Sequence, residues 1–192
     1  MRAPPINILI VHGTLGHPSS NWFPWLKDEL VKDGHIVEIP LFPSPDNQCF
    51  TAWREIALNT LQDWDKSRTL LIGHRLGASF IFRLAEEAKT PFKGVFSICP
   101  FVRDVGLDPY DELNRTFIHH PFDWPLINRN TGRAVCIAGG DDPYVPLSYS
   151  KEVADSARAE WIVVEKGGHL NAEFGYLKFP LLLDKIRQTI AI

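Results

Sequence analysis

The sequence is poor in cysteine, the residue that stabilises many small secreted proteins. It has three cysteines, Cys49, Cys99 and Cys136, among 192 residues. An odd number of cysteines without clustering fits neither a disulfide framework nor a structural zinc site. We therefore expect a cytoplasmic protein with reduced thiols and no bound metal.

The chain also lacks a strong excess of either charge and any long hydrophobic run. Its 20 basic and 23 acidic residues give a net charge of −3, and the basic residues are scattered, which argues against nucleic-acid binding. No apolar run approaches the roughly 20 residues that a transmembrane helix needs. The first five residues, Met-Arg-Ala-Pro-Pro, lack the cleavage region of a signal peptide. The length of 192 residues predicts one domain over residues 1–192. The absences predict that this domain binds neither nucleic acid nor membranes.

Short apolar runs rich in β-formers alternate with amphipathic helical patterns along the chain. The predicted strands are residues 6–12, 36–39, 69–73, 93–99, 134–138 and 160–164. The predicted helices are residues 21–32, 49–65, 76–88, 147–157 and 180–190. Residues 101–133 are expected to form an irregular connection with a helical turn near 124–128. This alternation predicts an α/β protein with a doubly wound, mostly parallel sheet of about six strands.

The segment Gly73-His74-Arg75-Leu76-Gly77 follows the third predicted strand. It has the frame G-x-S-x-G of a nucleophile elbow, in which a sharp strand-to-helix turn exposes a serine hydroxyl. Arginine occupies the serine position. A guanidinium stays protonated at neutral pH and has no lone pair with which to attack a carbonyl. One residue therefore decides whether this chain can be a hydrolase.

Three other strand ends carry residues of the same chemistry. His12-Gly13-Thr14 follows the first predicted strand, Asp141-Asp142-Pro143 the fifth and Gly167-Gly168-His169 the sixth. Ligands of open parallel sheets bind at the carboxyl ends of the strands. The chain order of oxyanion loop, nucleophile position, acid and histidine is that of the α/β-hydrolase triad.

With these motifs, the chain resembles the small serine hydrolases of the retinoblastoma-binding-protein-9 and YdeN-like family, within the α/β-hydrolase fold. The resemblance spans essentially the whole chain and departs from the family at Arg75. It implies an α/β-hydrolase fold with little or no lid, hydrolysis of small esters or acyl compounds, and no cofactor. Further matching segments are the tryptophan-rich residues 21–26, the proline loop 40–45 with Trp53, and the aromatic residues 120–124.

The resemblance also implies the roles of two charged residues. His169 would be the general base, and Asp142 would hold its ring in the correct tautomer. We expect Asp142 rather than Asp141 to be the acid, because the acid usually precedes the Pro-x-Val-Pro segment directly; Asp141 would then be a turn or helix-cap carboxylate.

The oxyanion hole would combine the backbone N–H of Leu76 with that of Gly13 or Thr14. These donors do not depend on the side chain at position 75. A small ester or acyl ligand is the expected partner, and no motif indicates a protein partner. The residues that could also line the pocket are His74, Trp22 and Trp124. The adjacent His119 and His120 have no metal-ligand partner nearby in the sequence.

Arg75 is expected to sit in a strained turn with positive φ, beside the positive end of a helix dipole. We expect relief through a salt bridge to Asp142 or Asp141, or through escape of the guanidinium into solvent. We also expect Arg75 to occupy the volume that an ester needs. Loss of the nucleophile makes the chain nearly inactive as a serine hydrolase.

Three hypotheses fit this sequence. The chain is a hydrolase in which arginine has replaced the serine, with the rest of the site intact. Alternatively, it is a pseudoenzyme that binds a small anionic or acyl ligand or a protein partner, with Arg75 as the binding cation. In the third hypothesis another residue, such as Ser79, has become the nucleophile, although Ser79, Thr14 and Cys99 each have a simpler structural explanation.

Overall fold

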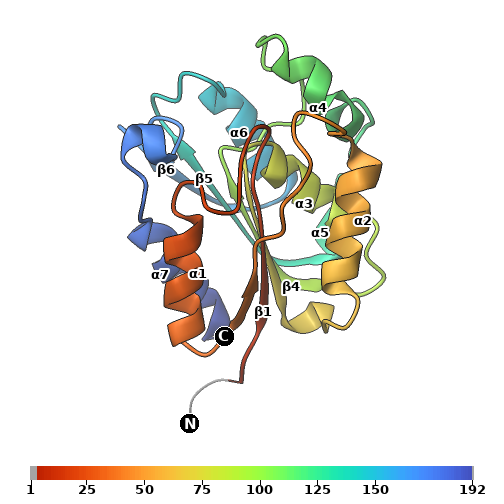
Figure 1. Ribbon diagram of the computed structural model, residues 1–192, viewed down its shortest axis with the longest axis vertical. Helices are drawn as coiled ribbons and strands as arrows, with labels where there is room; N and C mark the ends of the chain where they lie inside the picture. The colour runs from red at the N-terminus through yellow and green to blue at the C-terminus, as the bar shows by residue number, and fades with distance from the viewer. Residues whose placement is uncertain (1–3, 192) are drawn as a thin grey trace.

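The computed structural model describes residues 4–191 and centres on a six-stranded sheet (Figure 1). The strands are β1 (Asn7–Val11), β2 (Ile36–Glu38), β3 (Thr69–His74), β4 (Phe92–Ile98), β5 (Thr131–Gly139) and β6 (Glu160–Val164). Their order is β2-β1-β3-β4-β5-β6, and each neighbouring pair is parallel. The prediction of a mostly parallel six-stranded α/β sheet is confirmed. All six carboxyl ends therefore lie at one edge.

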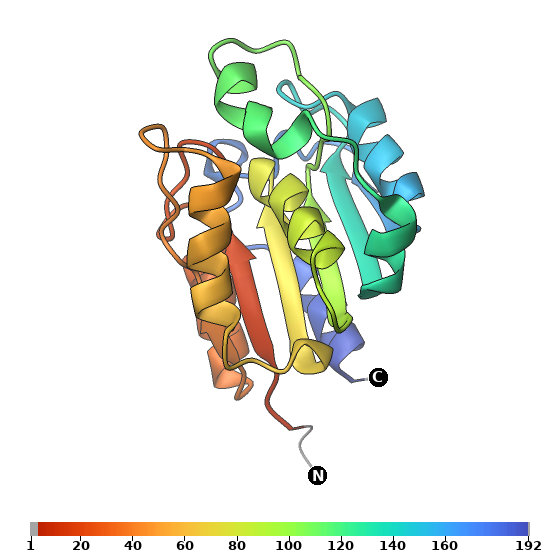
Figure 2. The same cartoon turned by 90° about the vertical axis from the view of Figure 1, so that its right-hand side faces the viewer.

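Helices cover both faces of this sheet (Figure 2). They are α1 (Phe23–Lys32), α2 (Phe50–Leu61), α3 (Leu76–Glu86), α4 (Tyr110–Ile118), α5 (Trp124–Arg129), α6 (Leu147–Ser156) and α7 (Pro180–Ile190), with short 3-10 turns η1 (Lys66–Arg68) and η2 (Ala172–Phe174). Helices α1 and α7 pack on one face, and α2 to α6 lie on the other. The pleat explains the two layers, because alternate side chains of a strand point to opposite faces. In β1, Leu9 packs with α2 and α3, whereas Ile8 packs with α1 and α7.

The segment between β4 and β5 differs from the sequence prediction. It was expected to be irregular except for one turn, but it contains α4 (Tyr110–Ile118) as well as α5. Helix α4 lies beyond the carboxyl end of the sheet (Figure 2). It packs there through Phe117 and Ile118, which are buried in the core cluster of α2 and α3. A short helix therefore covers part of the edge at which the site lies.

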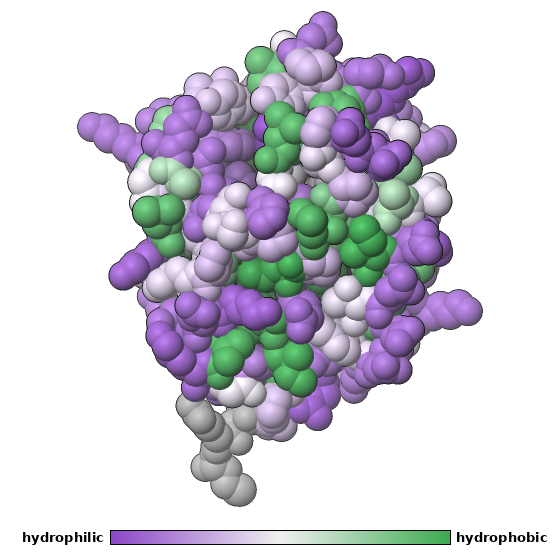
Figure 3. Space-filling model, in the orientation of Figure 1, coloured by the Kyte–Doolittle hydropathy of each residue, from purple (hydrophilic) through white to green (hydrophobic). Residues whose placement is uncertain are grey.

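The surface does not gather its apolar side chains into one region on the face shown in Figure 3, where green groups are separated by hydrophilic ones. Within residues 4–191, none of the helices is long and apolar enough to cross a membrane.

Candidate active site

The turn between β3 and α3 has the geometry of a nucleophile elbow. Arg75 adopts φ 56° and ψ −120° and forms the N-cap of α3. A Cβ atom on Gly73 would lie 2.3 Å from the carbonyl oxygen of Gly77, and one on Gly77 would lie 2.3 Å from that of Val11. Only glycine fits at both positions. The elbow is thus kept in full, including its strained central residue, although that residue is an arginine.

An acid–base pair lies beside the elbow. His169 Nδ1 is 2.8 Å from Asp142 Oδ2, and both side chains are buried. The other oxygen of Asp142 accepts hydrogen bonds from the amides of Tyr144 and Val145, at 2.8 and 3.1 Å. Burial raises the pKa of Asp142, but the His169 ring and these amides outweigh burial and hold it below the usual range. In the neutral ring the bond to Asp142 places the proton on Nδ1 and leaves Nε2 as an acceptor.

The neighbouring acid, Asp141, has a different contact. Its Oδ1 accepts a hydrogen bond from the amide of Gly168 at 2.7 Å, next to His169 in the chain. The structure therefore brings Asp142, and not Asp141, to the imidazole of His169, while Asp141 fixes the backbone before it.

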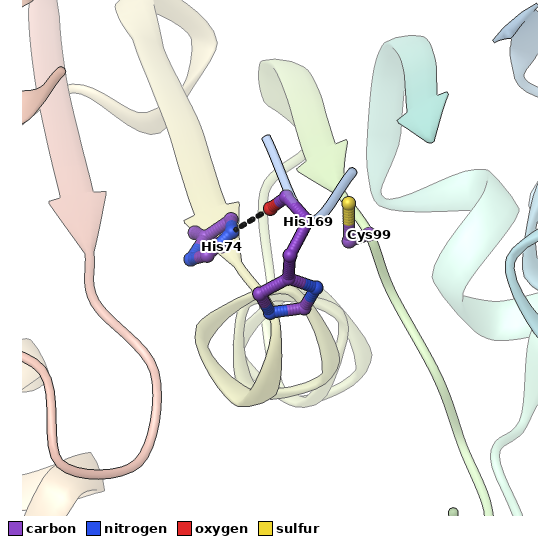
Figure 4. A group of neighbouring side chains, drawn as sticks. All are labelled: His74, Cys99 and His169. Carbon is purple, nitrogen blue, oxygen red and sulfur yellow. Dashed lines mark hydrogen bonds between the residues drawn. The ribbon is translucent and has the colours of Figure 1, made fainter. Parts of the chain in front are cut away.

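His74 and Cys99 lie on either side of His169 (Figure 4). His74 Nε2 donates to the carbonyl oxygen of His169 at 3.0 Å, because a carbonyl can only accept. Burial, followed by the nearby His169, lowers the pKa of His74 to about 3, so its ring is neutral at physiological pH. Burial and then Asp142 raise the pKa of the Cys99 thiol well above its usual value. Both side chains are therefore uncharged, and His74 holds the backbone of His169.

The side chains of His74, Cys99 and His169 also present their ligand atoms within 4.8 Å of one another, as a metal site would. A thiol ligates metals as the thiolate, whereas the Cys99 thiol is held protonated. The nitrogens His74 Nε2 and His169 Nδ1 already bond to protein oxygens. The protonated thiol and the two hydrogen bonds favour a hydrogen-bonded cluster over a metal centre.

The loop after β1 approaches the elbow closely. A Cβ atom on Gly13 would lie 3.1 Å from Arg75 Cβ and 3.5 Å from the amide nitrogen of Leu76. Glycine at position 13 therefore keeps open the space in front of this amide. The first amides of a helix have no acceptor within the helix, so the Leu76 N–H at the start of α3 can serve an oxyanion.

Thr14 ties this loop to α4. Its hydroxyl lies 2.5 Å from Oδ1 of Asn114, and the amide group of Gln48 donates to Thr14 and to Asn114 at 3.1 and 3.2 Å. All three side chains are buried. Thr14 is thus a hydrogen-bonded anchor, and the loop that carries it is fixed from two directions.

The Arg75 side chain packs on α4. Its guanidinium carbon lies 4.4 Å from the centre of the Tyr110 ring, a cation–π distance. Burial lowers the pKa of Arg75, whereas Tyr110 and Asp142 raise it. In residues 4–191 no carboxylate lies within salt-bridge distance of this guanidinium, so the expected ion pair with Asp142 or Asp141 is wrong. Both carboxylates are already held by other partners, and the aromatic face replaces them.

A small pocket of about 180 Å³ opens between the elbow and the loops. Arg75 forms part of its wall. That its side chain takes up the volume an ester needs stays a prediction. The residues around it are Gly13, Thr14, Leu15, Gly16, Ser20, Asn21, His74, Arg75, His169 and Asn171. The pocket is lined mainly by loop residues, several of them polar.

Two tryptophans expected in the pocket lie elsewhere. Trp22 is fully buried in the core beside Phe179, and its indole N–H donates to the carbonyl of Leu170 at 3.0 Å. Trp124 stacks on Phe122 at the start of α5. Both predictions are wrong for the pocket at the elbow: Trp22 packs in the core, and Trp124 borders a separate pocket beside α5 and α6. His74, the third expected lining residue, does border the pocket.

Strained backbone is concentrated around the site. Besides Arg75, the non-glycine residues Leu15, Asn21, Cys99 and Leu170 have φ values of 48–58°. Leu15 and Asn21 line the pocket, and Leu170 follows the base. Such conformations cost about 1–3 kcal/mol each and persist where the surrounding structure enforces them. The frame around position 75 is thus built at a cost in stability.

None of the alternative nucleophiles considered from the sequence is available in this arrangement. The Ser79 hydroxyl is buried and donates to the carbonyl of Phe101. The Thr14 hydroxyl is held by Asn114, and the thiol of Cys99 is buried and protonated. A substitute nucleophile is therefore disfavoured.

Sequence reasoning missed two residues of α4 that shape the site, Tyr110 and Asn114. A signal for them exists, because Tyr110, Leu113, Asn114, Phe117 and Ile118 follow a helical 3–4 spacing. The polar Asn114 interrupts that apolar stripe, and Pro109 precedes the helix.

Comparison with known proteins assigns the family. The serine hydrolase family model matches residues 8–188, nearly the whole chain. The chain belongs to the serine hydrolase family. Its relatives include the hydrolase-family protein YdeN of Bacillus subtilis, 28% identical over 179 residues that cover 92% of each chain. The serine hydrolase RBBP9 of Rattus norvegicus is 26% identical over 178 residues, covering 90% of this chain and 91% of its own. The resemblance stated from the motifs is confirmed.

Solved structures agree with this serine hydrolase assignment. The crystal structure of the ydeN gene product superposes with a TM-score of 0.89 at 27% identity, covering 97% of this chain and all of the other. The esterase Est1E from Butyrivibrio proteoclasticus superposes with a TM-score of 0.76 at 12% identity, covering 100% and 90% of the two chains, and shares the fold alone. The α/β-hydrolase fold is confirmed.

Proposed function

We propose that this serine hydrolase carries the acid–base machinery for small esters and lacks only the nucleophile. With arginine at position 75, the protein turns over esters very slowly, because a guanidinium cannot attack a carbonyl. The observation that supports this proposal is the state of His169. Its Nδ1 is bonded to Asp142, and its buried Nε2 has no hydrogen-bond partner among residues 4–191. A histidine held in this way is arranged to accept a proton that no neighbouring group supplies.

The chemistry follows if position 75 carries a hydroxyl. The hydroxyl oxygen attacks the ester carbonyl while His169 Nε2 takes its proton, and Asp142 stabilises the imidazolium that forms. The amide of Leu76 and a donor from the 13–14 loop stabilise the oxyanion. His169 then gives its proton to the leaving alcohol, and water hydrolyses the acyl-enzyme by the reverse sequence of proton transfers.

Restoring the hydroxyl tests this proposal. The substitution Arg75→Ser should raise the turnover of p-nitrophenyl acetate by at least about 10³-fold, since loss of a triad serine costs on the order of 10⁶-fold. Arg75→Ala opens the same space without supplying a nucleophile and should stay at the level of the unchanged protein. Equal activity of the serine and alanine variants, both correctly folded, contradicts the proposal.

A second candidate function is ligand binding without turnover. One observation favours it: Arg75 is a half-buried cation that borders the pocket and has no carboxylate partner within residues 4–191. A protein that binds in this way loses its ligand when Arg75 becomes serine, whereas a silenced hydrolase gains turnover.

A further inference from the structure

The half-buried Arg75, at the start of α3, differs from the buried Arg83 of the same helix. Arg83 donates to three main-chain carbonyls and pairs with Glu86 at 2.8 Å. Arg75 contacts the ring of Tyr110, and no acceptor in the described part of the chain reaches its buried Nε. Buried charges in proteins are normally paired and hydrogen-bonded. A bound anion would supply the acceptor that the Nε–H group of Arg75 lacks.

Two further atoms that lack a hydrogen-bond partner within residues 4–191 belong to residues that line the same pocket. They are Nε2 of His169 and Oδ1 of Asn171, and both are buried. With the proton of the neutral His169 ring on Nδ1, Nε2 is an acceptor, as is the amide oxygen of Asn171. The residues around the pocket therefore carry one cationic donor and two neutral acceptors, shielded just behind its wall. A simple carboxylate satisfies the donor only, and a neutral alcohol satisfies an acceptor only.

We propose that the unaltered protein binds a small hydroxycarboxylate in this pocket. The carboxylate accepts from the guanidinium of Arg75, and the hydroxyl donates to His169 Nε2 or to Asn171 Oδ1. This inference rests on the second candidate function, binding by the chain as written. Because the three atoms are shielded, entry requires a small shift of the wall, and Arg75 is held there by Tyr110 and by no carboxylate.

The size of the pocket limits the ligand. Its volume of about 180 Å³ lies below the roughly 300–1,000 Å³ of pockets for drug-sized molecules. Lactate has the required groups on a three-carbon frame. Propionate has the same frame without the hydroxyl, and lactamide has it without the negative charge.

Calorimetric titration of the unaltered protein with these three compounds tests the inference. Lactate should bind at least about tenfold more tightly than propionate or lactamide, because each of these leaves one polar group unpaired. Arg75→Gln should abolish the preference for lactate over lactamide. Arg103→Gln is the matched control and should retain it, because Arg103 also lies over a tyrosine ring, Tyr149, but is exposed and away from the pocket.

Three results overturn the inference: no lactate binding, propionate or lactamide binding as tight as lactate, or an unchanged preference in Arg75→Gln. Sulfate binding as tight as lactate overturns it as well, because the site would then select charge alone. If Arg75→Gln fails to fold, the three-ligand comparison on the unaltered protein still decides. If lactate does not bind and Arg75→Ser turns over esters, this inference fails and the hydrolase proposal stands.

Discussion

The guanidinium carbon of Arg75 lies 4.4 Å from the centre of the Tyr110 ring, and this contact joins the elbow to helix α4. The contact explains how a long charged side chain is accommodated at a turn that normally carries serine. It also leaves the bond between His169 and Asp142 undisturbed at 2.8 Å. An arginine at position 75 is thus compatible with an intact bond between His169 and Asp142.

The first prediction concerns the strain at position 75. Arg75→Gly should raise the free energy of unfolding by about 1 kcal/mol, because glycine adopts positive φ without steric cost and the half-buried cation is removed. Urea denaturation measures the change. Arg103→Gly, at a residue without positive φ, should bring no gain; a loss of stability in Arg75→Gly would show that the Tyr110 contact outweighs the strain.

The second prediction concerns the second glycine of the elbow. Gly77→Ala should destabilise the protein by roughly 3 kcal/mol or more, because its Cβ would lie 2.3 Å from the carbonyl oxygen of Val11 in the adjacent strand. Gly106→Ala is the control, because Gly106 has φ 79° but no atom of the described residues lies within 4 Å of an added Cβ. It should cost only about 1 kcal/mol of backbone strain. Equal costs at the two sites would contradict the close approach at the elbow.

The third prediction is a pH dependence of stability. Burial lowers the pKa of His74 from 6.5 to about 3 on folding, so the unfolded chain binds more protons between these values. The contribution of neutral His74 is fully present above pH 6.5 and is lost as the pH falls toward 3, at up to about 1.4 kcal/mol per pH unit. Urea denaturation between pH 7.5 and 4.5 measures the slope.

A matched pair of variants isolates this effect. His74→Gln should flatten the slope, because the glutamine amide can still donate to the carbonyl of His169 but does not titrate. His120→Gln, at an exposed position, should leave the slope as it is. Equal slopes in the unchanged protein and His74→Gln would rule out His74 as the source.

The fourth prediction concerns Asn114, which anchors Thr14 from α4. In the Arg75→Ser background, Asn114→Ala should lower kcat by about tenfold, because the loop that supplies an oxyanion donor loses its support and misplacement of such donors costs rate. Thr116→Ala is the control. Thr116 also joins α4 to the body of the protein, through the amide of Phe50, but it does not touch the loop. A similar fall in kcat for both variants would reduce Asn114 to a general support of α4.

The sheet and the elbow could be predicted from the sequence because local signals determine both. Apolar runs of parallel strands are nearly continuous, and the predicted strand 160–164 matches β6 in both bounds. Gly73 and Gly77 mark the elbow in the sequence. A side chain at Gly73 would collide with the backbone of Gly77, and one at Gly77 would collide with the backbone of Val11. The chain order of the acid and the histidine followed from the same strand ends.

The surroundings of Arg75 could not be predicted because they depend on contacts distant in sequence. Tyr110 reaches the elbow from α4, a helix whose stripe is interrupted by the buried Asn114. The choice of Tyr110 over Asp142 as the partner of Arg75 depends on how fully the carboxylate of Asp142 is occupied. The sequence predicts its bond to His169, whereas the bonds from the amides of Tyr144 and Val145 appear only in the folded structure. The sequence predicts Trp22 and Trp124 as possible pocket residues. In the folded chain Trp22 packs in the core and Trp124 lies beside a different pocket.

The most direct measurement is covalent labelling of position 75 by a fluorophosphonate, read by intact mass and by the labelled peptide. The proposal predicts no label on the unchanged protein and one label, at position 75, on Arg75→Ser. Adding His169→Ala should abolish the label, because the base is then missing. A folded Arg75→Ser protein without label, or label on the unchanged protein, would contradict the claim that this hydrolase site is complete except for its nucleophile.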